Sequence, residues 1–198
     1  MLNLFKSDRL AKACKAIESD NLEQLSKLLK KFGTNEINQP VSETLPTLTE
    51  FCILQESAKA LKLVLQNGGS PDQQSKNQPD LSLYELALQR ENSLTLLTSL
   101  LETGQNHDCQ ALLKDCFNQC APNQLMLHIS LLLQNGAEIT DDTVHCALSR
   151  GELPLINFLF NSGAILPEDI NSRGYEEEII RYAEKCVEDL KIRQMFLT

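Results

Sequence analysis

Tryptophan is absent from this chain of 198 residues, and the aromatic residues together make up only 5% of it. Leucine must therefore supply most of the hydrophobic core. No stretch approaches the ~18–20 consecutive apolar residues that a membrane-spanning helix requires, so no transmembrane segment is expected. Residues 1–9 also lack the early positive charge, the long apolar run and the small-residue cleavage site of a signal peptide. These absences predict a cytoplasmic protein, with secretion by a route that needs no classical leader left open.

Sequence signatures of catalysis are missing as well. The chain contains no Gly-x-Ser-x-Gly, no phosphate-binding loop, no dinucleotide fingerprint and no His-Glu-x-x-His. The acidic run Glu176–Glu178 precedes Lys185 and Arg193, an order that complements the dipole of a helix and needs no catalytic role. We therefore expect no catalytic residues, no cofactor and no enzymatic activity.

Seven cysteines, an odd number, are spread among predicted helices instead of forming the loop-rich framework of a small secreted protein. Cysteines that stand where a helix needs a small apolar residue are interpreted as reduced packing residues. They are Cys14, Cys52, Cys146 and Cys186.

The closest approach to a metal site is His107 and Cys109 followed by Cys116 and Cys120. Cys116 and Cys120 are four residues apart and share a helix face, but no Cys-x-x-Cys pair exists and the spacing matches no common zinc module. No metal ligand is predicted. A thiol- or metal-dependent enzyme, in which Cys116, Cys120 and His107 converge, stays as an alternative.

The formal net charge is −9, with 42% hydrophobic and 23% charged residues, as in a folded soluble protein. Residues 1–31 hold seven Lys and Arg against four Asp and Glu, so the excess of acidic residues lies in the rest of the chain. An acidic body repels phosphate groups, and nucleic acid is therefore not an expected partner. The basic face of the N-terminal helix is interpreted as solvated surface.

The most informative feature present is a leucine-rich amphipathic segment that runs five times into a glycine, at intervals of 27 to 36 residues. The glycines are Gly33, Gly68, Gly104, Gly136 and Gly163. Four positions before each of them stands Leu29, Val64, Leu100, Leu132 or Leu159. This pattern predicts a repeated helix face, stopped each time by a residue that accepts the left-handed conformation. A period of this length is typical of a stacked helical solenoid.

Each glycine closes a predicted pair of helices. The expected pairs are 8–18 with 22–32, 47–55 with 57–67, 82–90 with 92–103, 108–119 with 123–135, and 141–149 with 153–162. Capping boxes are predicted at Thr47–Glu50 and Ser82–Glu85. The whole chain, 1–198, is interpreted as one repeat domain with repeats at about 6–38, 44–72, 80–106, 107–139 and 140–165. Residues 166–198, with a short helical turn and then a longer helix from Tyr175, are expected to cap the stack.

Residues 143–164 resemble an ankyrin repeat, whose pattern is Thr-Pro-Leu-His-x-Ala-Ala-x-x-Gly-His followed by an aliphatic helix ending in Leu-Leu-x-x-Gly-Ala. The matching residues are Thr143, His145, Ala147, Gly151, Leu159, Gly163 and Ala164. Val144 replaces Pro-Leu with one residue fewer, and the Thr-Pro-Leu-His tetrapeptide is nowhere intact. The family's hairpin signal is missing too, and long polar connections follow Gly33 and Gly68, so loops are expected in the first half and almost none in the second.

The resemblance implies an all-α, ankyrin-type helical repeat solenoid with a C-terminal capping helix; a tetratricopeptide-like α-solenoid is the alternative fold. It further implies a protein-protein interaction module that displays a concave helical face and long loops to a protein partner. The implied partner-binding residues are Glu18, Ser19, Gln55, Glu56, Gln89, Arg90, Ser149 and Arg150, with Glu43, Thr44 and Asp80 on the loops. A bacterial effector or toxin-associated protein that uses the same face on a host protein is an alternative function.

Overall fold

The computed structural model describes residues 2–103 and 108–197, and this part of the chain is helical and contains no strand. The only pairing of the β type within it is an isolated bridge between Gln74 and Ser82. The chain divides into two compact units, residues 1–108 and 109–198. Of the helices in the described part, none combines the length and the apolar character needed to cross a membrane.

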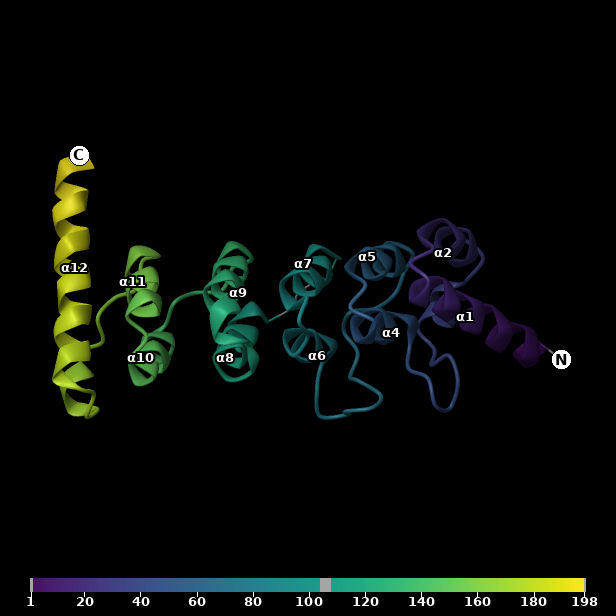
Figure 1. Ribbon diagram of the computed structural model, residues 1–198, viewed down its shortest axis with the longest axis horizontal. Helices are drawn as coiled ribbons and strands as arrows, with labels where there is room; N and C mark the ends of the chain where they lie inside the picture. Colours follow the sequence, from purple (N-terminus) through teal and green to yellow (C-terminus); the bar gives the residue numbers. More distant parts are fainter. Residues whose placement is uncertain (1, 104–107, 198) are drawn as a thin grey trace. The chain divides into compact units, whose positions relative to one another are not determined.

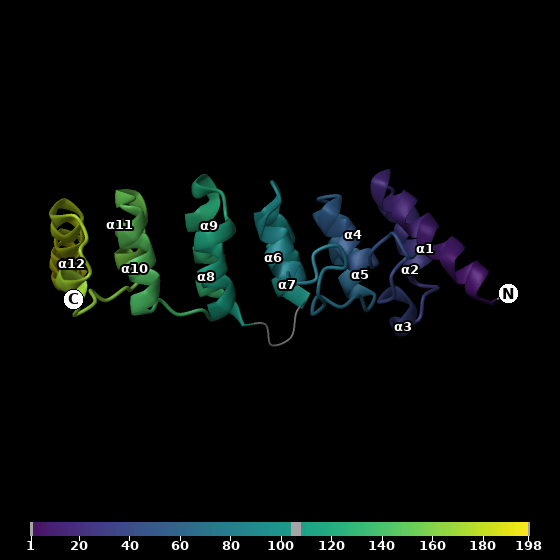
Figure 2. The ribbon, with the colours of Figure 1, turned by 90° about the horizontal axis from the view of Figure 1, so that it is seen from below.

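The first unit is built from three helix pairs. They are α1 (Leu2–Glu18) with α2 (Leu22–Leu29), α4 (Leu48–Leu54) with α5 (Ala58–Gln66), and α6 (Leu83–Leu88) with α7 (Ser93–Thr103), and a short helix α3 (Thr34–Ile37) follows the first pair. The first helices pack on one another, α1 on α4 and α4 on α6. The second helices do the same, α2 on α5 and α5 on α7, which gives the two layers visible in Figure 1. Figure 2 shows the same helices from below.

The second unit contains two further pairs and a terminal helix. The pairs are α8 (Cys109–Gln119) with α9 (Pro122–Gln134) and α10 (Asp141–Arg150) with α11 (Leu153–Asn161). A 3-10 turn, η1 (Ile170–Ser172), leads into α12 (Glu177–Leu197). Helix α10 packs on α8, and α12 packs along α11. The short turn predicted near Leu166 therefore forms a few residues later, and the long terminal helix is confirmed.

The repeated apolar face predicted from the sequence is buried in every pair. The residues four positions before the glycines are at most 1% exposed: Leu29, Val64, Leu100, Leu132 and Leu159. The apolar residues seven positions before are buried to the same extent: Leu61, Leu97, Ile129 and Ile156. One stripe of each second helix thus faces the interior, as the helical period requires.

Three of the glycines end their helices in the left-handed conformation, with φ of 97° at Gly68, 95° at Gly136 and 102° at Gly163. Each closes a Schellman motif. In the last one, Ala164 N donates to Leu159 O at 3.0 Å and Gly163 N donates to Phe160 O at 3.1 Å. The same pair of bonds recurs at Gly68 and Gly136, and in each motif the outer acceptor is the buried residue of the repeated face.

The expectation for Gly33 was wrong, and Gly104 lies outside the described residues. Gly33 is extended, with a φ of −80° and a ψ of 156°, because it is the residue from which the new helix α3 begins and not the residue that closes α2. Helix α2 accordingly ends at Leu29, earlier than predicted, with Lys31 and Phe32 in tighter turns. Helix α1 begins at Leu2, ahead of the expected Asp8; no glycine or proline among those residues stops it.

The turn inside a helix pair also uses the left-handed region. Gly151 has a φ of 64°, and the non-glycine residues Asp20 and Glu56 have φ of 50° and 52° at the corresponding points. This conformation costs an L-residue about 1–2 kcal/mol, since Cβ approaches the following carbonyl. A non-glycine residue accepts that cost at two such turns, which indicates that the packing of the paired helices holds the turn in place.

The glycine positions give a matched test. Replacing Gly136 or Gly163 with Ala is expected to lower the free energy of unfolding by about 1–2 kcal/mol. The cause is backbone strain alone, because an added Cβ at either position meets no atom within 4 Å. Gly33→Ala, equally open but at a negative φ, is the control and should leave stability unchanged or higher. Urea unfolding that ranks the three variants alike would contradict the assignment.

Candidate functional site

Two long loops project from the first unit, one before α4 and one before α6 (Figure 1). The first folds back on itself, since Val41 N donates to Pro46 O at 3.0 Å. The second does so as well, with Ser75 N donating to Leu81 O at 2.8 Å. Only residues 137–140 separate Gly136 from α10 in the second unit. The predicted contrast between long and short connections is therefore confirmed for these segments.

Lys76 joins the two loops. Its Nζ, on the second loop, donates to the backbone carbonyls of Ser42 and Glu43 at 2.6 Å each and to that of Leu45 at 3.2 Å. Three acceptors converge on one ammonium group, which carries three donors. The tip of the first loop is thereby tied to one point of the second.

Glu50, in the first turn of α4, anchors the second loop through its side chain. Its carboxylate is 1% exposed, and it accepts from Ser75 Oγ at 2.6 Å and from Lys76 N at 2.9 Å. The capping box predicted for this helix is therefore only half formed. Thr47 Oγ1 accepts from Glu50 N, but the Glu50 side chain turns to the loop. The box at Ser82 and Glu85 is complete.

Asn38 fixes the start of the first loop. Its Nδ2 donates to Gly68 O at 2.8 Å, and its Oδ1 accepts from Ser70 N at 2.7 Å. Sequence reasoning missed Asn38, Glu50 and Lys76 as loop anchors. No pattern marks them, since each acts on residues at least 25 positions away.

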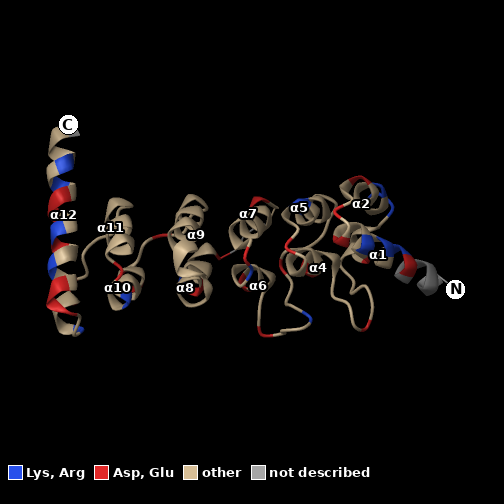
Figure 3. Cartoon of the chain, in the orientation of Figure 1, with Lys and Arg blue, Asp and Glu red and all other residues tan. Residues whose placement is uncertain are grey.

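Three of the predicted partner-binding residues, Glu43, Thr44 and Asp80, are exposed on these loops. Figure 3 shows acidic segments in red on both loops. Glu18 and Gln55 are exposed at the other ends of the first helices, Glu18 as the last residue of α1 and Gln55 as the residue after α4. The seven residues of α4 rise about 10 Å, so the predicted residues of this unit fall into two groups at opposite helix ends.

Several of the other predicted residues make contacts within the fold. Glu56 Oε2 accepts from Asn92 N at 3.0 Å and so links consecutive helix pairs. Arg150 donates to Phe117 O at 3.2 Å and pairs with Glu152 at 2.7 Å. The hydroxyls of two serines bond to helix carbonyls one turn back, Ser19 to Lys15 O and Ser149 to His145 O. Gln89 is exposed and Arg90 is half-buried at the end of α6.

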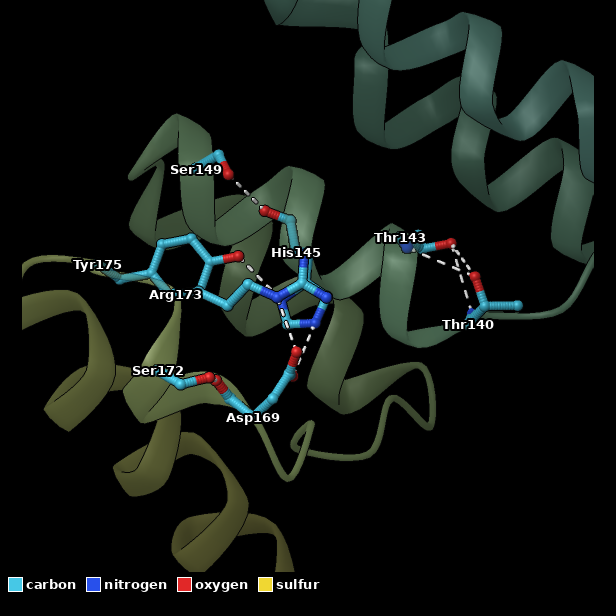
Figure 4. A network of polar contacts seen from close by, with 8 residues as sticks. All are labelled: Thr140, Thr143, His145, Ser149, Asp169, Ser172, Arg173 and Tyr175. Carbon is cyan, nitrogen blue, oxygen red and sulfur yellow. Dashed lines mark hydrogen bonds and ion pairs between the residues drawn. The ribbon is translucent and has the colours of Figure 1, made fainter.

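A polar network in the second unit surrounds His145, which is 7% exposed (Figure 4). Its Nε2 lies 3.0 Å from Asp169 Oδ1, and its Nδ1 lies 2.8 Å from the Tyr175 hydroxyl, whose ring stacks on the imidazole. The hydrogen bond from Arg173, at 2.7 Å, lowers the pKa of Asp169, which is therefore the anionic partner. The network joins α10 to the segment that leads into α12.

A second histidine, His128 on α9, interacts with Cys120, the residue that follows the end of α8. Cys120 N donates to Cys116 O at 3.0 Å, and the interaction between the two thiols raises the pKa of Cys116 and lowers that of Cys120. His107, the expected third member, lies outside the described residues, and sequence reasoning missed His128. Within the described residues, no group of three or more His, Cys, Asp and Glu side chains is arranged to hold a metal ion.

Comparison with known proteins adds no relative: no family model, no curated protein and no solved structure matches the chain.

The loop anchor can be tested by removing one charge. Lys76→Met removes the ammonium group but keeps the length of the side chain, and it is expected to cost about 1 kcal/mol of stability. The larger expected effect is local: faster amide exchange and faster proteolysis in residues 41–46, which lose their cross-loop bonds. Lys59→Met, on exposed α5 surface, is the matched control. Equal protection of the loop in both variants would show that Lys76 does not order it.

The His145 network gives a second test. Tyr175→Phe keeps the ring stacked on His145 but removes the 2.8 Å hydrogen bond, with an expected loss of about 1 kcal/mol in the free energy of unfolding. Tyr182→Phe, which removes a hydroxyl with a longer 3.4 Å contact to Asn157, serves for comparison and should cost less. An equal or larger loss from Tyr182→Phe in chemical denaturation would argue against the network.

Proposed function

We propose that this protein is a non-enzymatic, ankyrin-type repeat protein that binds a protein partner through the two loops of its first unit. The observation that carries the proposal is that both loops are anchored from within while their outer residues stay exposed. Lys76 and Glu50 hold the loop backbones. Glu43, Thr44 and Asp80 remain at the surface.

Anchored loops favour binding because their ordering is complete before the partner arrives. An unanchored loop loses conformational freedom on binding, and this loss subtracts from affinity. The two loops are already held, one by the buried carboxylate of Glu50 and the other by Lys76, which donates to three carbonyls, so this conformational freedom is lost before binding. Loops on a rigid helical scaffold are also where binding residues concentrate in general.

The repeat-protein part of the proposal is supported by features that recur along the chain. Schellman motifs with a left-handed glycine close α5, α9 and α11. Left-handed residues stand at the turn between helices in three of the pairs, at Asp20, Glu56 and Gly151. The segment most similar to the ankyrin pattern also has the His of that pattern buried and hydrogen-bonded.

The charge of the loops favours a partner surface that carries Lys or Arg. Glu43 and Asp80 are both exposed, and the chain as a whole is acidic. Complementary charge at an interface raises the association rate and selects among partners more than it raises final affinity.

Site-specific photo-crosslinking in native lysate tests the proposal. A photo-reactive residue is placed at Thr44, at Asp80 and, as a control, at exposed Lys59 on α5. We expect the same protein to crosslink from positions 44 and 80 and not from 59, with weaker crosslinking at higher salt. Crosslinking to one protein from position 55 but not from 44 and 80 would instead locate binding at the other ends of the first helices. Equal crosslinking from position 59 would contradict a loop site.

Arg150 is unsuitable as a probe of binding. It donates to Phe117 O and pairs with Glu152, so its replacement changes the packing of α10 on α8 as well as any surface. Gln55, exposed at the end of α4, is the better choice for the helix-end arm of the experiment.

A further inference from the structure

The turn between α8 and α9 brings two thiols and one imidazole together. Cys116 is fully buried on α8, and Cys120, just beyond the helix end, is half-buried. The two are linked through the backbone, where Cys120 N donates to Cys116 O at 3.0 Å. Pro122 then begins α9, whose second turn carries His128 back toward the thiols.

His128 is a buried residue whose two ring nitrogens differ in their contacts. The ring is 0% exposed, and Nδ1 bonds to Gln124 O at 2.9 Å. Nε2 is buried and, among the described residues, has no hydrogen-bond partner of ordinary geometry. Burial opposes protonation of His128, but the interactions with Cys120 and Gln124 O raise its pKa above the usual value.

The electrostatics of the two thiols differ. The hydrogen bond from Cys116, together with His128, lowers the pKa of Cys120. The same contact and burial raise the pKa of Cys116, which stays a thiol. Elsewhere burial raises the pKa of Cys14, Cys52, Cys146 and Cys186. Since the thiolate is the reactive form, Cys120 differs from these cysteines in the property that controls reactivity.

We propose that Cys120 and Cys116 form a peroxide-reactive dithiol, in which half-buried Cys120 is oxidised first and Cys116 resolves it to a disulfide, with His128 as the positioning residue. This is a modification site, separate from the loops of the first unit. The co-reactant is a hydroperoxide, of which hydrogen peroxide is the simplest.

The chemistry balances in two steps. The Cys120 thiolate attacks one peroxide oxygen, the O–O bond breaks, and the departing hydroxide takes the His128 proton to leave as water, giving a sulfenic acid on Cys120. Cys116 then loses its proton and attacks the Cys120 sulfur. The S–S bond forms, the S–O bond breaks, and a second water leaves. Two thiols are oxidised by two electrons and one hydroperoxide is reduced.

The backbone permits the bridge. Residues four apart on a helix are separated by a rise of about 6 Å, within the ~4.4–6.8 Å Cα separation that disulfides span. The helix ends at Gln119, so Cys120 lies where the chain can adjust to bring the two Cβ atoms closer.

Peroxide titration of the full chain, followed by alkylation and peptide mass mapping, tests the proposal. We expect one intramolecular disulfide, Cys116–Cys120, at stoichiometric peroxide, while half-buried Cys146 stays alkylatable as the internal control. Cys116→Ser should accumulate a sulfenic acid on Cys120, trapped by dimedone. Cys120→Ser should leave Cys116 reduced. His128→Gln should slow oxidation of Cys120 by about tenfold, the change in thiolate fraction that one pKa unit brings.

Folding of each variant is checked by the alkylation rate of Cys186, a buried cysteine of the same unit, which rises if the core opens. The proposal is overturned if folded wild-type protein oxidises Cys120 no faster than Cys146, or if the first disulfide involves another cysteine. An unchanged oxidation rate in folded His128→Gln would overturn the role given to His128.

Discussion

A buried apolar stripe on the second helix of every pair is the constraint on which the rest of this structure depends. These helices are short, eight residues in α2 and nine in α5 and α11, and helices of that length are marginal in water without packing. Burial of residues such as Val64 and Leu159 supplies the packing. The backbone carbonyls of these two residues are also the acceptors of the Schellman motifs that end α5 and α11. The buried stripe therefore also helps to determine where the chain leaves these helices.

The first helices of the second and third pairs are short, and a long loop precedes each of them. Helices α4 and α6 span seven and six residues, and the chain between the pairs has to return outside them. In the first unit that return is long, and it is ordered by polar contacts instead of apolar burial. Glu50 has two functions there, since its N–H helps to begin α4 while its buried carboxylate holds Ser75 and Lys76.

The two buried histidines of the second unit differ in their contacts and therefore in their roles. His145 has both ring nitrogens in contact with polar partners, Asp169 and Tyr175, and thereby joins α10 to the terminal segment. His128 has one nitrogen on a backbone carbonyl, its Nε2 is buried without a hydrogen-bond partner among the described residues, and its interaction with Cys120 raises its pKa. A histidine with both nitrogens in polar contacts stabilises an interface, whereas one that interacts with a cysteine lowers the pKa of the thiol.

From the sequence alone came the all-helical class, most helix boundaries, the buried stripe and the left-handed Gly68, Gly136 and Gly163. These follow from local rules: apolar spacing, capping residues and the freedom of glycine at positive φ. The same rules predicted a left-handed Gly33, which was wrong because a further helix begins at the next residue. Cys116 and Cys120 were paired by their spacing, but His128 was not joined to them. Lys76, Glu50, Asn38 and His128 act on residues distant in sequence or on the next helix. Only tertiary packing brings such groups together. A hydrogen bond between separate segments produces no periodic pattern in the sequence from which it could be predicted.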